Sequence, residues 1–279
     1  MHYERVLVAL DDGQTASRVL SVATMLARAW DARLDPIHVP AELPGHPPRT
    51  QPTPRLLAPG DPAEALLTEA GNDPDATLLT LGTRALPAAS ELVFGSVCAT
   101  VVRRLRAPVV IVAPHAATPE RPPRRIVVPL DGSTTADAIL PVASRWARSL
   151  HCSLELLHVV YPPGDPRQGE VRLPEEVDQV VERLRSHAAA LSAEGVDASW
   201  RLHEATSSGA GIVDHARRTS ADIIAMATHG RGALARLIAG STTIEVVRHT
   251  ALPVLALRPA GLDTHEPRSR PGHRTGRRP

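Results

Sequence analysis

The chain has 279 residues, enough for two domains, and 43% of them are hydrophobic while only 2% are aromatic. Cores built from Val, Leu, Ile and Ala suit parallel strands that are covered by helices on both faces. The net charge of +1 gives no global reason to expect nucleic acid, and all 31 basic residues are arginines, which excludes a P-loop lysine and a Schiff-base lysine. No run of about 18 apolar residues predicts a transmembrane helix, so we expect a cytoplasmic protein without membrane contact.

The sequence of the first half returns in the second half. Residues 5–39 realign on residues 125–159 without a gap. The matched positions include Leu10 with Leu130, Asp11 with Asp131, and His38 with His158. Further along the chain, a second block realigns Gly95-Ser96 on Gly240-Ser241. Two blocks in the same order indicate a duplication, and the two units are called copy one and copy two below.

Each copy alternates short apolar runs with helical patterns, which is typical of βαβ units and a parallel sheet. In copy two the predicted strands are residues 125–130, 153–159, 198–204, 222–227 and 253–257. The predicted helices between them are residues 134–150, 174–194, 210–218 and 240–249. Copy one follows the same order, except that a Pro-rich stretch at residues 46–54 replaces most of the long helix. We therefore expect an α/β fold of two tandem Rossmann-like domains, each with a five-stranded parallel sheet of order 3-2-1-4-5.

The duplication sets the expected domain bounds. They are residues 1–113 for the first domain, 114–124 for a Pro/Arg-rich linker, 125–258 for the second domain and 259–279 for a disordered basic tail. No aromatic residues interleave with the arginines of the tail, so we expect them to be solvated rather than bound to nucleic acid. Cys98 and Cys152 are isolated in the sequence, which is typical of buried structural thiols.

The ligand of a doubly wound sheet binds at the carboxyl ends of the strands, where the strand order reverses. In each copy this rule points to the loop after the first strand and the loop after the fourth. The second of these loops ends in a Gly-Ser pair that opens the next helix. Such a helix start offers unpaired N–H donors and the positive end of the helix dipole, so it can hold a phosphate without any lysine.

The loop after the fourth strand resembles the G-x2-G-x9-G-[ST] motif of the universal stress proteins, whose ATP-binding members use it for ribose and phosphates. Copy two has Ala227, Gly230 and Gly240-Ser241 at the motif positions. Copy one has Gly82, Ala85 and Gly95-Ser96. The resemblance spans nearly all of residues 3–258 and includes the segments PLDGS, LLHVV and PVLAL. It implies domains of the adenine nucleotide alpha hydrolase-like type.

The resemblance also implies the ligand, an adenine nucleotide: ATP, with or without Mg²⁺. It places Asp131 and Asp11 near the ribose or a metal-linked phosphate, and Val159 and Val39 against the adenine. The expected contacts are Asp131, Val159, Ala227, Thr228, Gly230, Gly240, Ser241 and Thr242 in copy two, and Asp11, Val39, Gly82, Gly95 and Ser96 in copy one. Other readings stay open: the aspartates could cap the following helices, and the glycines could be plain turn residues. His38 and His158 are interpreted as buried, hydrogen-bonded histidines.

The implied function is ATP binding in a stress or dormancy response, with regulation of an unknown protein partner rather than turnover as the output. Copy two is expected to bind better, because copy one has Pro87, which lacks an N–H donor, where copy two has Gly232. In the family the last strands pair between subunits, so the two copies are expected to form an internal dimer, and a homodimer of the whole chain stays open.

Two alternatives remain at this point. The alanines at positions 85 and 227 keep open an interaction or scaffold module that no longer binds ATP. A slow ATPase or autophosphorylating protein would use Ser241 or Thr242 as the acceptor, and the sequence shows no base for it.

Overall fold

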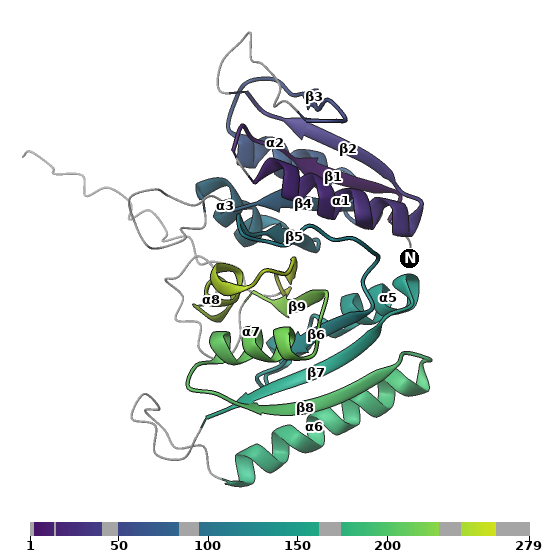
Figure 1. Cartoon of the computed structure of the whole chain (residues 1–279), viewed down its shortest axis with the longest axis vertical. Coiled ribbons are helices and arrows are strands. Elements are labelled where there is room, and N and C mark those ends of the chain that lie inside the picture. Colours follow the sequence, from purple (N-terminus) through teal and green to yellow (C-terminus); the bar gives the residue numbers. More distant parts are fainter. Residues whose placement is uncertain are drawn as a thin grey trace, which may run out of the picture.

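The computed structural model describes residues 3–13, 15–40, 50–83, 95–161, 174–228 and 241–260. Over these ranges the chain forms one sheet that is covered by helices on both faces (Figure 1). The strands are β1 (Arg5–Ala9), β2 (Arg33–His38), β3 (Arg55–Leu56), β4 (Thr77–Gly82), β5 (Val109–Val112), β6 (Arg125–Pro129), β7 (Ser153–Val160), β8 (Ala198–Glu204), β9 (Ile223–Ala227) and β10 (Val254–Leu257). The helices are α1 (Ala16–Trp30), α2 (Pro62–Gly71), α3 (Ser96–Arg104), α4 (Thr134–Asp137), α5 (Leu140–Leu150), α6 (Pro174–Ala193), α7 (Ser208–Arg218) and α8 (Ser241–His249).

The strand order is β3-β2-β1-β4-β5-β10-β9-β6-β7-β8. Each half therefore has the expected order 3-2-1-4-5, and its strands are parallel. The last strands β5 and β10 pair antiparallel with each other, as expected for an internal dimer. One correction follows: the two five-stranded sheets are joined at this pair into a single ten-stranded sheet, which runs from β3 at one end of Figure 1 to β8 at the other.

The antiparallel junction has a symmetric register. Val110 faces Leu255, and on either side Ile111 faces Val254 and Val109 faces Ala256. Val110 and Leu255 are the same position in the two copies, so a pseudo-two-fold axis passes through this pair. The repeat in the sequence is thus a repeat in space.

Two hydrophobic layers cover the faces of the sheet. One layer joins α1, α4, α5 and α6 to alternate strand residues such as Val6 and Val8, and the other joins α2, α3, α7 and α8 to the intervening residues such as Leu7. Alternation is expected because successive side chains of a strand point to opposite faces. Since both faces of the central strands are buried, β5, β9 and β10 read as continuous apolar runs.

Local sequence signals explain where the helices of copy two begin. The expected helix at residues 134–150 is broken into α4 and α5, because Pro141 lies in the first turn of α5 and has no N–H for a continuous helix. Ser133 caps α4 by accepting a hydrogen bond from the Ala136 N–H at 3.1 Å. Ser207 does the same for α7, which starts two residues earlier than predicted.

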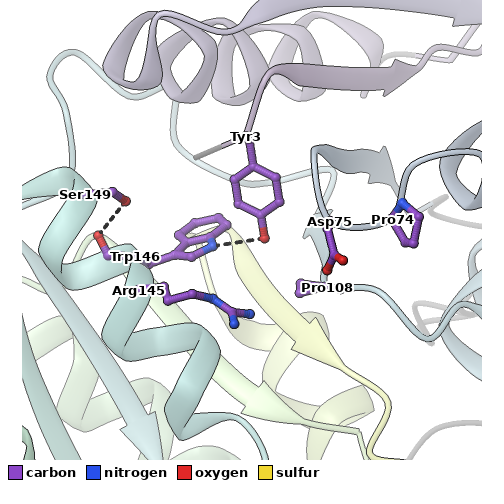
Figure 2. Close-up of a pocket in the computed structure, with 7 residues that line it drawn as sticks. All are labelled: Tyr3, Pro74, Asp75, Pro108, Arg145, Trp146 and Ser149. Atoms are coloured by element: carbon purple, nitrogen blue, oxygen red, sulfur yellow. Dashed lines mark hydrogen bonds between the residues drawn. The ribbon is translucent and has the colours of Figure 1, made fainter. Parts of the chain in front are cut away.

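An aromatic cluster joins the two halves on the side of α1 and α5. The rings of Trp30 and Trp146 meet edge to face with centroids 4.8 Å apart, and the Trp146 indole N–H donates to the Tyr3 hydroxyl at 3.3 Å. Figure 2 shows this contact beside a cavity of about 30 Å³, which is far too small for a nucleotide. Burial raises the pKa of Tyr3, so its hydroxyl stays protonated.

Both cysteines are free and buried, as expected. Burial raises the pKa of Cys98, and it raises that of Cys152 to about 12. The thiols are therefore not reactive thiolates at neutral pH. No helix in the described part of the chain is long and apolar enough to cross a membrane.

Candidate functional site

The carboxyl ends of neighbouring strands meet at the expected place in each copy. β1 lies between β2 and β4, and the end of β1 is level with Ile37 and Leu81 on these strands. Asp11, Val39 and Gly82, which end or follow the three strands, therefore share one edge of the sheet. In copy two β6 lies between β7 and β9. The corresponding edge carries Asp131, Val159, Ala227 and Thr228.

The two aspartates after the first strands order their own turns. The Asp11 carboxylate accepts a hydrogen bond from the Gly13 N–H at 2.9 Å. The Asp131 carboxylate accepts from the Ser133 N–H at 2.9 Å and from the Ser133 hydroxyl at 2.5 Å. Asp131 thus holds Ser133, the residue that caps α4.

A glycine between Asp131 and Ser133 is required by the backbone. Gly132 has a φ of +82°, and a Cβ there would lie 2.9 Å from a methyl group of Val180 on α6. Any other residue would be strained in this conformation and would also displace α6. The turn is therefore fixed by the fold, whatever ligand it meets.

Buried histidines fix the position of both aspartates. His38 Nδ1 lies 2.8 Å from the carbonyl oxygen of Leu10, and His158 Nδ1 lies 2.7 Å from that of Leu130. Because a carbonyl only accepts, Nδ1 carries the proton in each case. Each histidine ties the end of the second strand to the residue before Asp11 or Asp131. The interpretation of both as satisfied buried histidines is confirmed.

The first motif position has a packing role in copy one. A Cβ at Gly82 would lie 2.9 Å from Cγ2 of Thr15 and 3.0 Å from Cγ2 of Val19, both of which belong to the start of α1 and its cap. The missing side chain makes room for α1 and not for a phosphate. The counterpart Ala227 ends β9, is 8% exposed, and β9 lies against α4.

The start of α3 is open. Gly95 is the N-cap residue, no side chain of the described residues caps the helix, and a Cβ built at Gly95 would meet none of their atoms within 4 Å. The first turn holds no acidic residue, and Ser96 is exposed. The N–H groups of this turn have no partner within the helix, so together with the helix dipole they can receive an anion.

The counterpart in copy two is described only in part. α8 begins at Ser241, its first turn also lacks acidic residues, and Thr242 in that turn is half-buried. Thr228 is 1% exposed, and its N–H donates to the Leu257 carbonyl at 2.9 Å, so it extends the pairing of β9 with β10. The expected contacts Gly230 and Gly240 lie outside the described residues.

A polar cluster that the sequence did not bring to attention joins α7 to this edge. The Ser207 hydroxyl donates to the Glu245 carboxylate on α8 at 2.6 Å, and the Tyr161 hydroxyl lies 2.6 Å from the Ser208 hydroxyl. The signal was the Ser-Ser-Gly run at residues 207–209, where a serine N-cap is followed by a glycine. The partners Glu245 and Tyr161 are distant in sequence and carry no local signal.

No group of three or more His, Cys, Asp or Glu is arranged to hold a metal ion among the residues that the structure describes. This edge offers hydrogen bonding by backbone amides and carboxylates, next to Val39 and Val159.

Comparisons with known proteins agree with this architecture. The sequence model described as "Universal stress protein family" matches residues 46–113 and 123–258. The crystal structure of a universal stress protein from Archaeoglobus fulgidus DSM 4304 is 18% identical over 92% of this chain and 99% of its own, with a TM-score of 0.65. A putative universal stress protein from Pseudomonas aeruginosa UCBPP-PA14 is 15% identical over 92% of this chain and 94% of its own, with a TM-score of 0.59. Both similarities show the fold over nearly the whole chain.

A third structure was determined with a nucleotide. The universal stress protein from Archaeoglobus fulgidus in complex with dAMP is 23% identical over 48% of this chain and 98% of its own, with a TM-score of 0.39.

Proposed function

Since the chain belongs to the universal stress protein family, we propose that it binds ATP at the carboxyl edge of its sheet and acts as a regulatory protein of a stress or dormancy response. Copy two is the stronger site in this proposal. The adenine lies against Val159 and the phosphates lie at the start of α8, with Asp131 facing the ribose or a metal-linked phosphate.

One observation carries the proposal: in copy one the start of α3 has no side-chain cap among the described residues and lies beside the reversal of strand order, and the repeat puts the start of α8 in the equivalent position of copy two. A phosphate at such a helix start would meet N–H groups that have no partner within the helix and the positive end of the helix dipole. The same Gly-Ser pair opens α8 in copy two, where Gly230 and Gly232 precede it in the sequence. Backbone donors of this kind need no lysine, which the chain lacks.

The direction in which a Cβ at position 82 would point supports the ranking of the two copies. A side chain at this motif position points toward α1, so by the repeat the Ala227 methyl group is directed toward α4 rather than toward a ligand. Ala227 therefore does not count against ATP binding in copy two. The alternative of an interaction module without ATP then rests on Ala85 in copy one, where Pro87 also removes an N–H donor.

Matched glycine variants of the full-length chain test the proposal. Gly240→Val should fill the space in front of the α8 amides and cost two charge-assisted hydrogen bonds, which weakens ATP binding by roughly a hundredfold. Gly95→Val should have little effect, because copy one is the weaker site. The measurements are calorimetric titration with ATP, with and without Mg²⁺, and native mass spectrometry of the purified protein for co-purified nucleotide.

The control is thermal stability without ligand, which should fall only modestly in both variants because a side chain at Gly95 meets no neighbouring atom. If Gly240→Val bound ATP as tightly as the parent, the phosphates would not lie at the start of α8. Steady release of inorganic phosphate from ATP would contradict regulation without turnover and would indicate a slow ATPase instead.

A further inference from the structure

A buried cluster of titratable side chains lies between α7 and the outer strands of copy two. His215 Nε2 on α7 is 2.5 Å from the Glu155 carboxylate on β7, and the side chains of both residues are no more than 10% exposed. The ring of His203 on β8 meets that of His215 edge to face with centroids 5.3 Å apart. His203 Nε2 is also 3.4 Å from the Asp214 carboxylate. None of these groups belongs to the ATP site proposed above.

In copy one, ion pairs of arginines fasten the equivalent helix. Glu155 corresponds to Asp35 in the repeat, and α2 takes the place of α7. Arg5 binds Asp35 at 2.7 Å and Glu69 of α2 at 2.8 Å, and Arg55 binds the same two carboxylates at 3.4 and 3.1 Å. Arginine keeps its charge across the physiological range, whereas histidine changes charge within it. The two copies therefore fasten equivalent helices with different responses to acid.

We propose that α7 is an acid-sensitive element: a proton taken up by His203, whose ring packs against that of His215, loosens α7 from β7 and β8 and weakens nucleotide binding by copy two, while copy one is unaffected. The loosening of α7 stands on the cluster alone, and only its effect on the nucleotide rests on the proposed function.

The charges around His203 determine the direction of the effect. Burial lowers the pKa of His203 most, the neighbouring His215 and Arg218 lower it further, and Asp214 opposes them. The folded state therefore takes up this proton at a lower pH than an open state, whose histidine titrates near about 6.5. Below that pH the open state binds more protons, so acid favours the opening of α7, and the helix is held fully above it.

The start of α7 contacts both sides of the proposed site. A Cβ at Gly211 would lie 2.8 Å from a methyl group of Val159, so the helix backbone rests directly on the residue that would face the adenine. The α7 cap Ser207 is bonded to Glu245 on α8 at 2.6 Å. Displacing α7 therefore frees Val159 and removes a partner of the helix that begins at the phosphate position.

Hydrogen exchange of the unliganded, full-length chain tests the helix itself. Between about pH 7.5 and about pH 5.5 we expect the protection factors of α7 amides to fall, while those of α2 stay constant. His203→Gln should keep its α7 protection in acid. His115→Gln, at an exposed position between the two halves, should behave like the parent.

A second variant at position 203 shows whether the result of His203→Gln comes from the loss of the histidine or from misfolding. The pairing of β2 with β3 and of β7 with β8 makes Leu57 the counterpart of His203. His203→Leu copies the residue type that copy one uses there, so it should also keep α7 protected in acid. Equal loss of protection in α7 and α2, or loss that persists in both His203 variants, would overturn the proposal.

Calorimetry with ATP tests the link to the nucleotide. The parent and His115→Gln should bind more weakly at the lower pH, and His203→Gln should lose less affinity. Because ATP itself titrates in this range, each variant is compared with the parent at the same pH, at both pH values. Absence of ATP binding at every pH would refute the proposed function. The acid sensitivity of α7 would then be decided by the hydrogen-exchange experiment alone. Binding with an equal pH response in all variants would refute the link.

Discussion

At the residue scale, a glycine that matches a binding motif need not face the ligand. Gly82 matches the first motif position, yet its missing side chain is what lets Thr15 and Val19 approach β4. Gly95 matches the third position, and a Cβ there would meet no atom of the described residues within 4 Å. The sequence treats the two glycines alike, because their difference lies in where a Cβ would point, which only the packed helix reveals.

Gly82→Ala should therefore destabilise the protein. The new methyl group would lie 2.9 Å from Cγ2 of Thr15 and 3.0 Å from Cγ2 of Val19, so α1 must shift at a cost of about 1–3 kcal/mol in the free energy of unfolding. Urea denaturation followed by circular dichroism measures this. Gly60→Ala is the control, because a Cβ at Gly60 has no atom within 4 Å. Equal midpoints for the two variants would mean that position 82 is not a packing position.

At the element scale, helix starts could be predicted where the signal is local. Ser133 directly precedes the predicted helix and caps α4, and the order of strands and helices followed from the repeat. The break between α4 and α5 was missed, although Pro141 is its cause, because an apolar helical pattern continues across it. The histidine cluster and the bond from Ser207 to Glu245 could not be predicted, since they join residues that only the folded sheet brings together.

The two helix caps make a matched pair. Ser207→Ala should cost about 1–2 kcal/mol, because the Ala210 N–H loses its acceptor and the Glu245 carboxylate loses its donor. Asp61→Ala in copy one removes an acceptor that the Ala63 N–H reaches at 2.8 Å and the Glu64 N–H at 3.4 Å but leaves no carboxylate without a donor, so it should cost about 1 kcal/mol.

Chemical denaturation gives the two costs, and hydrogen exchange shows where the protection is lost. If protection in Ser207→Ala were lost only in the first turn of α7, the serine would act as a helix cap and would not stabilise α8. We expect the loss to extend to the start of α8, because Glu245 belongs to that helix. Asp61→Ala should leave α8 unchanged.

At the scale of the whole molecule, the duplication explains both the order of the sheet and the pairing of its halves. The pseudo-two-fold axis at Val110 and Leu255 is what an ancestral homodimer would leave after fusion. The aromatic cluster does not follow this symmetry, since Trp30 corresponds to Leu150 and Trp146 to Leu26 in the repeat. The two halves have therefore become specific for each other at the helices while keeping a symmetric strand junction.

Copy two alone, as residues 121–260, should consequently form a dimer through β10. Without β5 its apolar edge strand is bare, and such an edge is a template for pairing. Antiparallel pairing about Leu255 would repeat the observed register, with Val254 facing Ala256 of the second molecule. Light scattering coupled to size-exclusion chromatography should give the mass of a dimer at micromolar concentration.

Leu255→Glu should convert this dimer to a monomer, because two carboxylates would face each other across the two-fold axis, where like charges destabilise a strand pair. The control is Leu202→Glu on β8, the opposite edge of the same half, where the side chain is already 39% exposed. If Leu202→Glu and not Leu255→Glu dissolved the dimer, β8 would be the associating edge. A monomeric parent fragment would mean that Tyr3 and Trp30 of copy one, rather than the strand junction, hold the halves together.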